Sequence, residues 1–195
     1  MPTDTGSLST ALALADADSF AVARLEEGMA LRSAGVRAPI VLLEGVFSAE
    51  QLAEAAHHGF ELVVHDPLQL KLLEAHRGAE RFVVWIKIDT GMNRLGFRPE
   101  TFPDALARLR ALTVPALELR VMTHLARADE IEQSDDRHAA RHVSDGARRQ
   151  RCRDWTASAS RPASATPPAI LGWPRCAGRL GAAGPRAVRR FAVRR

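Results

Sequence analysis

A lysine inside an apolar strand and an arginine just beyond the strand's end are the residues of this chain best suited to chemistry. Residues 82–88 are almost continuously hydrophobic, as is typical of a parallel strand covered on both faces. Lys87 interrupts this run, and a buried ammonium is costly unless a partner or a chemical change neutralises it. Asp89-Thr90-Gly91 then turns the chain, and Arg94 follows where barrel enzymes hold their active sites. Lys87 within the strand and Arg94 just beyond it are therefore the first candidates for a functional role.

Alternating strands and helices are expected to position these two residues. Strands are predicted at residues 19–23, 40–43, 62–65, 82–88 and 117–124, and helices at 24–34, 48–58, 67–75 and 100–112. Ser48 and Asp66-Pro67 are start signals for helices, and Gly35 and Gly59 are stop signals. Strand starts recur about every 20 residues, which is the rhythm of βα units around a parallel sheet. The pattern predicts an α/β fold, about half of a (β/α)8 TIM-type barrel.

Four segments together carry a resemblance to a known family. The first is Lys87-x-Asp89-Thr90-Gly91-Met92-x-Arg94-x-Gly96-Phe97, and the others are residues 20–32, 39–45 and 121–130. In order and spacing they resemble alanine racemases, over roughly residues 11–133. The resemblance implies the barrel, a following β domain, and pyridoxal phosphate as the cofactor that interconverts L- and D-alanine. D-alanine made in this way supplies bacterial cell-wall precursors.

The resemblance also implies roles for particular residues. Arg94 is expected near the substrate carboxylate, where a guanidinium can donate two parallel charge-assisted hydrogen bonds. Lys87 matches a position that carries a carbamate in many members, and this anion would orient Arg94; unmodified, Lys87 would pair with Asp89. His124 is expected at a strand end near the cofactor, with a capping or core histidine as the alternative. Met92 and Asn93 are expected to shape the loop.

Two proton-transfer groups of the family are not found in the sequence. Family members use a Schiff-base lysine and a tyrosine from the partner subunit, whereas this chain contains only Lys71 and Lys87 and no tyrosine. Lys71 is expected on a helix surface, and the Schiff-base lysine is expected just before Met1 in the original reading frame. We therefore expect the chain to be an inactive fragment of a racemase.

Other polar residues are expected to be structural or solvated. His57 and His58 are predicted to be exposed at a helix end. The acidic residues near position 130 are expected to form a solvated loop, and no metal site is predicted; they are Asp129, Glu130 and Glu132.

The charge of the chain divides sharply near residue 133. Residues 1–133 carry a net charge of −6 and residues 134–195 a net charge of +10, within an overall charge of +4. Beyond residue 133 the periodicity ends, yet residues 168–174 again resemble the family. Shifted reading frames of residues 1–6, 163–166 and 178–191 permit further family-like segments. We therefore predict a non-family leader at 1–10 and an irregular, frame-shifted Arg-rich tail at 134–195; a natural low-complexity tail is the alternative, and the coding DNA would decide.

Composition bounds the location and the partners. No apolar run is long enough to cross a membrane, no signal peptide is recognised, and Cys152 and Cys176 form no disulfide framework, so a cytoplasmic location is expected. The expected partners are alanine and, as in the intact family, a second copy in a homodimer; nucleic acid is not expected. Two alternatives stay open: a non-catalytic binding module with a basic tail, and a different pyridoxal-phosphate racemase.

Half a barrel leaves strand edges unpaired, so poor solubility is predicted.

Overall fold

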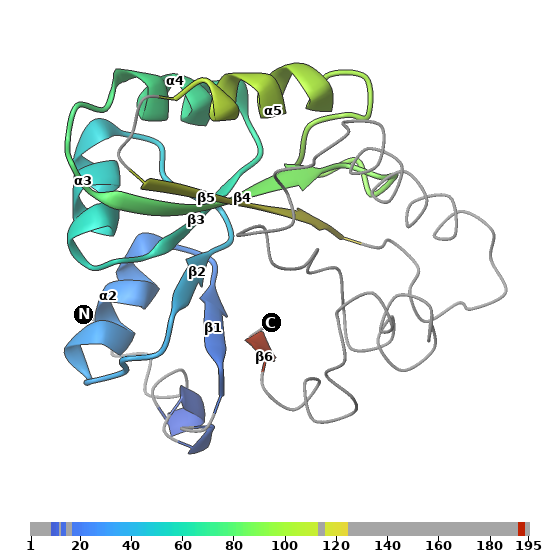
Figure 1. The fold of residues 1–195 in the computed structure, drawn as a ribbon. Coiled ribbons are helices and arrows are strands. Elements are labelled where there is room, and N and C mark those ends of the chain that lie inside the picture. Colours follow the sequence, from blue (N-terminus) through green and yellow to red (C-terminus); the bar gives the residue numbers. More distant parts are fainter. Residues whose placement is uncertain (1–8, 12, 15–16, 113–115, 125–190, 194–195) are drawn as a thin grey trace, which may run out of the picture.

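A computed structural model describes residues 9–11, 13–14, 17–112, 116–124 and 191–193 of the chain (Figure 1). The strands are β1 Ser19–Val22, β2 Ile40–Leu42, β3 Glu61–Val64, β4 Arg81–Ile88, β5 Ala116–Thr123 and β6 Phe191–Val193. The helices are α2 Leu25–Ser33, α3 Ala49–His57, α4 Pro67–Ala75 and α5 Phe102–Arg110. Each predicted element up to residue 124 is therefore present, with ends that differ from the prediction by two residues at most.

Local signals in the sequence set the helix ends. The Ser48 side chain accepts a hydrogen bond from the Gln51 N–H (3.2 Å), and the Asp66 carboxylate accepts one from the Leu68 N–H (2.8 Å). Each bond satisfies a donor that the first helical turn leaves without a partner. Gly35 and Gly59 have φ angles of 91° and 64°, the left-handed conformation that ends helices. The predicted caps are confirmed.

Six parallel strands form one sheet in the order β5-β4-β3-β2-β1-β6. The described helices α2 to α5 cover one face of this sheet, and their apolar side chains share a core with alternate strand residues such as Phe82, Val84 and Ile86 (Figure 1). The intervening residues, including Val63 and Trp85, form a second apolar cluster on the opposite face. We call this opposite face the inner face, because it corresponds to the interior of a barrel. The predicted α/β partial barrel is confirmed.

Strand β6 differs from the sequence-based expectation. No strand is predicted from the sequence beyond residue 133, but residues 191–193 pair in parallel with β1, with Ser19 opposite Phe191 and Ala21 opposite Val193. The physical reason is the free edge of β1, whose N–H and C=O groups otherwise lack a strand partner. The segment 168–174 and the acidic residues near position 130 lie outside the described residues. Within the described part of the chain, no helix is both long and apolar enough to span a membrane.

Candidate functional site

Lys87 lies at the carboxyl end of β4, and its side chain belongs to the inner face. It is 7% exposed and stands two residues after Trp85 and opposite Met122 of β5. The pKa of Lys87 is lowered, first by burial and then by the positive charge of Arg94, while the negative charge of Asp89 opposes the change. Arg94 therefore lies close enough to act on the amine. That Lys87 and Arg94 act together in one site stays a prediction, which this electrostatic coupling supports.

The loop that carries Arg94, residues 89–97, is closed at its base by the backbone. Phe97 N–H donates to the Lys87 carbonyl and Asp89 N–H donates to the Phe97 carbonyl, both at 2.8 Å. Gly96 has a φ of 134°, and a Cβ atom at this position would lie 2.6 Å from the Asp89 nitrogen. A glycine is required here because the two ends of the loop approach so closely. We call residues 89–97 the Arg94 loop.

Asp89 shapes the Arg94 loop from within. Its Oδ1 atom accepts hydrogen bonds from the N–H groups of Gly91 and Asn93, both at 3.0 Å. The Asn93 side chain donates to the Gly91 carbonyl (3.0 Å), and Asn93 has a positive φ of 55°. Asn93 therefore has the predicted role in the loop. The simple ion pair between Lys87 and Asp89 is not formed, since no ion pair among the described residues includes Lys87.

Arg94 is exposed, and within the described part of the chain its guanidinium takes part in no hydrogen bond or ion pair. His124 directly follows β5 and is half-buried. Because Ile88 pairs with Thr123 in the sheet, His124 comes next to the beginning of the Arg94 loop in register. Lys87, Arg94 and His124 thus occupy one edge of the sheet, at the carboxyl ends of two neighbouring strands.

Two threonines at this edge were missed by the sequence analysis. Thr123 donates a hydrogen bond to the Ile88 carbonyl (2.9 Å), and its hydroxyl lies 2.8 Å from the Thr90 hydroxyl. Thr123 is buried and Thr90 is half-buried. The available signal was a hydroxyl residue at the end of one strand and another just after its neighbour, which parallel pairing places at the same edge.

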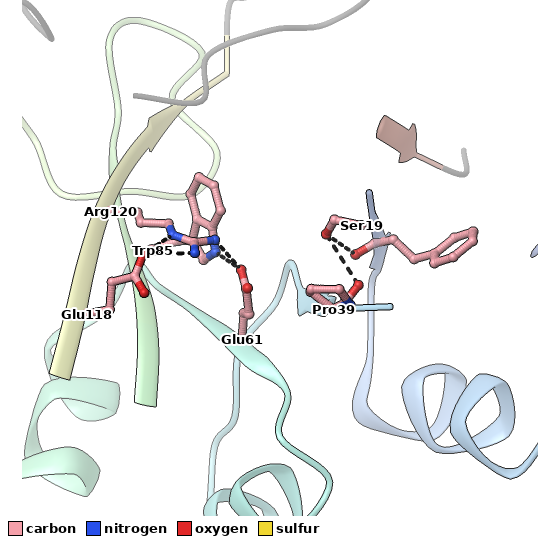
Figure 2. A network of polar contacts seen from close by, with 7 residues as sticks. Ser19, Pro39, Glu61, Trp85, Glu118 and Arg120 are labelled. Atoms are coloured by element: carbon pink, nitrogen blue, oxygen red, sulfur yellow. Dashed lines mark hydrogen bonds and ion pairs between the residues drawn. The ribbon is translucent and has the colours of Figure 1, made fainter. Parts of the chain in front are cut away.

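A polar network on the inner face was also missed (Figure 2). The Trp85 indole N–H donates to the Glu61 carboxylate (2.6 Å), and the Arg120 guanidinium donates to the same carboxylate (2.9 Å) and to Glu118 (2.9 Å). Arg120 also stands over the Trp85 ring, 4.9 Å from its centroid. We call these four residues the inner-face network. The alternation of Glu118 and Arg120 within an apolar strand was the signal that could have indicated it.

The remaining polar predictions have mixed outcomes. Lys71 is exposed on α4, as expected, and His57 is exposed. The prediction that His58 is exposed is wrong: it is half-buried, stacks on Phe60 with ring centroids 5.5 Å apart, and contacts Glu54 at 3.0 Å. The apolar ring provides this cover because Gly59 reverses the chain and brings Phe60 back beside the helix end.

Comparisons with known proteins agree with this geometry. A family model described as alanine racemase, N-terminal domain, matches residues 3–176. The alanine racemase of Nitrosococcus oceani is 54% identical over 119 residues, which cover 61% of this chain and 33% of the relative. The alanine racemase of Xanthomonas campestris is 42% identical over 162 residues, or 82% of this chain and 42% of the relative. This chain thus spans less than half the length of these two curated relatives.

Solved structures give the same result. The biosynthetic alanine racemase of Pseudomonas aeruginosa superposes with a TM-score of 0.75 at 31% identity, covering 87% of this chain and 45% of that one. The alanine racemase of Acinetobacter baumannii gives 0.73 at 27% identity, covering 85% and 47%. The family match extends beyond residues 11–133 at both ends. The expected leader, tail and reading-frame changes concern the coding DNA and stay predictions. The chain belongs to the alanine racemase family.

Proposed function

We propose that this chain provides the carboxylate-binding part of an alanine racemase site. Arg94 donates hydrogen bonds to the substrate carboxylate, Lys87 supports Arg94 from the inner face, and His124 lies toward the cofactor. One observation supports this assignment above the others. A guanidinium without a described partner is held beside a buried amine, at the sheet edge where parallel barrels bind their ligands. Such a guanidinium is available to form two parallel bonds with a carboxylate.

Lys87 is proposed to carry a carbamate. Its lowered pKa favours the neutral amine, and only a neutral amine can attack carbon dioxide. The nitrogen forms a bond to the carbon of carbon dioxide, one C=O bond opens to a carboxylate, and the nitrogen releases a proton to water. The product is an anion beside Arg94, which replaces repulsion between two cations by attraction. The guanidinium would then be oriented before the substrate arrives.

Pyridoxal phosphate, when bound, supplies the ring into which the carbanion of the substrate delocalises. The described residues do not supply its covalent anchor. Lys71 is exposed on α4, which packs on the opposite face of the sheet from Lys87. Lys87 itself matches the carbamate position of the family. The residues of this chain therefore do not fit the cofactor at its covalent attachment point.

Binding of alanine to the 195-residue protein tests the role of Arg94. We expect weak binding by isothermal titration calorimetry, lost in Arg94→Ala and about 10-fold weaker in Arg94→Lys, since a lysine cannot form the bidentate pair. Arg98 is a matched control: it is also exposed, lies four residues further along, and its side chain forms no hydrogen bond or ion pair among the described residues. Arg98→Ala should bind alanine like the parent chain. Equal affinity of Arg94→Ala and the parent chain for alanine would contradict the proposal.

The carbamate has its own test. Protein equilibrated with ¹³C-bicarbonate should show a carbamate carbonyl signal by NMR, and the signal should disappear in Lys87→Ala. Lys71→Ala is the internal control, because these are the two lysines of the sequence and Lys71 is exposed. A signal that follows Lys71 would contradict the proposal.

Turnover by this chain is not expected, because it contains no tyrosine and no anchoring lysine in the family position. A racemase assay with measurable conversion of L- to D-alanine would overturn this expectation. We further propose a cytoplasmic location and a homodimer for the intact protein, with D-alanine supplied to the cell wall. These proposals are supported by the family and by the low cysteine content of the sequence, two residues in 195.

A further inference from the structure

The Arg94 loop is connected to β5 through hydroxyl groups, in addition to its own backbone closure. Thr123 donates to the Ile88 carbonyl at the last residue of β4, and the Thr90 and Thr123 hydroxyls are 2.8 Å apart. These two bonds join the beginning of the loop to the strand that leads directly into His124. The other hydrogen bonds given above for the loop run within it or to Lys87 of β4.

The geometry of these bonds suits a fixed connection. The Thr123 hydroxyl has one proton, and the carbonyl of Ile88 takes it, so the Thr90 hydroxyl must be the donor in the second bond. Thr123 is 5% exposed, so water does not readily replace the bond to Ile88. Both residues are β-branched, which restricts their side-chain rotamers. The pair therefore holds the first residues of the loop in one orientation.

The remaining bonds transmit this orientation to Arg94. Asp89 binds the N–H groups of Gly91 and Asn93, and Asn93 precedes Arg94 directly. The backbone bonds between Lys87, Asp89 and Phe97 close the other end. With both ends and the interior held, the position of the Arg94 backbone, from which the guanidinium extends, depends on how the base of the loop packs on β4 and β5.

We infer that Thr90 and Thr123 are positioning residues that fix the Arg94 guanidinium relative to Lys87 and His124. The inference rests on the proposed function, in which Arg94 binds the substrate carboxylate. It adds two residues that touch neither substrate nor cofactor and act through Arg94. Loss of their bonds should let the loop move away from the inner face.

The amine of Lys87 offers a readout that requires no substrate. Pulsed acylation in carbon-dioxide-depleted buffer at a series of pH values, read by peptide mass spectrometry, gives an apparent pKa for each of the two lysines. Lys71 serves as the exposed reference. Arg94 lowers the pKa of Lys87 by charge repulsion, so a guanidinium that moves away should raise this pKa. Arg94→Ala gives the full rise and calibrates the scale.

Thr123→Val keeps the branched shape and removes the hydroxyl, and Thr123→Ser restores the hydroxyl. We expect the Lys87 pKa to rise in Thr123→Val toward the value in Arg94→Ala, and to stay at the parent value in Thr123→Ser. Thr90→Val, which removes only the second bond, should give a smaller rise and provides the test if Thr123→Val does not fold. Ser48→Ala, which removes a distant helix cap, controls for loss of stability alone and should leave the Lys87 pKa unchanged.

An unchanged Lys87 pKa in both valine variants would overturn the inference, as would an equal rise in Ser48→Ala. The outcome is separate from that of alanine binding. If Arg94→Ala binds alanine normally, the proposed function fails, yet the lysine titration still reports whether the threonines hold the loop. If alanine binding is lost only in Arg94→Ala and the Lys87 pKa is the same in the valine variants as in the parent chain, the proposed function stands and the positioning role is wrong.

Discussion

Charged side chains are paired at one end of the inner face and unpaired at the other. Toward the amino ends of the strands, the Arg120 guanidinium lies between the carboxylates of Glu61 and Glu118, and Trp85 donates a further bond to Glu61. At the carboxyl edge, Lys87 and Arg94 repel each other and form no ion pair with described residues. Asp89, the nearby anion, uses an oxygen to hold its own loop. The first group satisfies its own members, whereas the second leaves the Arg94 guanidinium available to an anionic ligand.

This difference indicates a structural role for the paired inner-face network and a ligand-binding role for Arg94. Charges that are paired and hydrogen-bonded within the protein have little left to offer a ligand. Two neighbouring cations in a partly desolvated position destabilise the fold slightly, and they persist where an anion relieves the repulsion. Four changes test this contrast, from the largest expected effect to the smallest.

Breaking the paired group should cost the most stability. Arg120→Met retains much of the side-chain volume but leaves the buried Glu61 carboxylate without its cation, and we expect a loss of about 3 kcal/mol in the free energy of unfolding. Glu118→Gln, at the more exposed end of the network, should cost less than about 1 kcal/mol. Urea denaturation measures both. Equal losses would mean that burial of Glu61 does not set the cost.

The Arg94 loop can be opened without changing any charge. Gly96→Ala places a methyl group against the Asp89 backbone, whereas Gly91→Ala has a similar φ of 130° but open space around the added carbon. Conformational strain should cost about 1 kcal/mol in both variants. The clash should add about 2 kcal/mol in Gly96→Ala and reduce alanine binding. Chemical denaturation and calorimetry on the two variants provide the measurements, and matching results would show that the close approach is unimportant.

The pH dependence of the free energy of unfolding should reveal the lowered pKa of the unpaired Lys87 amine. Because the pKa of Lys87 is lowered on folding, the unfolded chain binds more protons between the folded pKa and the usual lysine value of about 10.4. The contribution of Lys87 to stability should therefore rise with pH within this window and stay constant below it. In Lys87→Met this rise should be missing. The urea midpoints of the parent chain and of Lys87→Met, measured from pH 7 to 10 without carbon dioxide, should converge as the pH rises. A constant difference between the two midpoints across this range would contradict the lowered pKa of Lys87.

The smallest effect is expected for a paired charge on the outer surface. Arg108 on α5 donates two hydrogen bonds to Glu74 on α4, at 2.7 and 2.9 Å, and both side chains are partly exposed to solvent. Arg108→Ala should cost about 0.5 kcal/mol, because exposed ion pairs are screened. Adding 1 M salt to the parent protein should remove most of this difference. A loss as large as that of Arg120→Met would show that pairing, rather than burial, sets the cost.

Much of the fold could be predicted from the sequence because its signals are local. The apolar run with Lys87 inside it predicted β4, and Ser48 and Asp66 predicted the starts of α3 and α4. The family motif predicted that Arg94 and Lys87 share a site. Strand β6 was missed because its pairing partner is Ser19–Val22, at the other end of the chain.

The parts decided only by the tertiary structure involve side chains that are distant in the sequence. Trp85 and Glu61 are 24 residues apart, Thr123 and Ile88 are 35 apart, and Arg120 and Glu61 are 59 apart. A helix cap depends on neighbours within one turn, so the sequence by itself determines it. A bond between strands depends on their register, and a shift of one residue turns each side chain to the other face. The sequence therefore determined which residues could act, and the alignment of β3, β4 and β5 decided which of them meet.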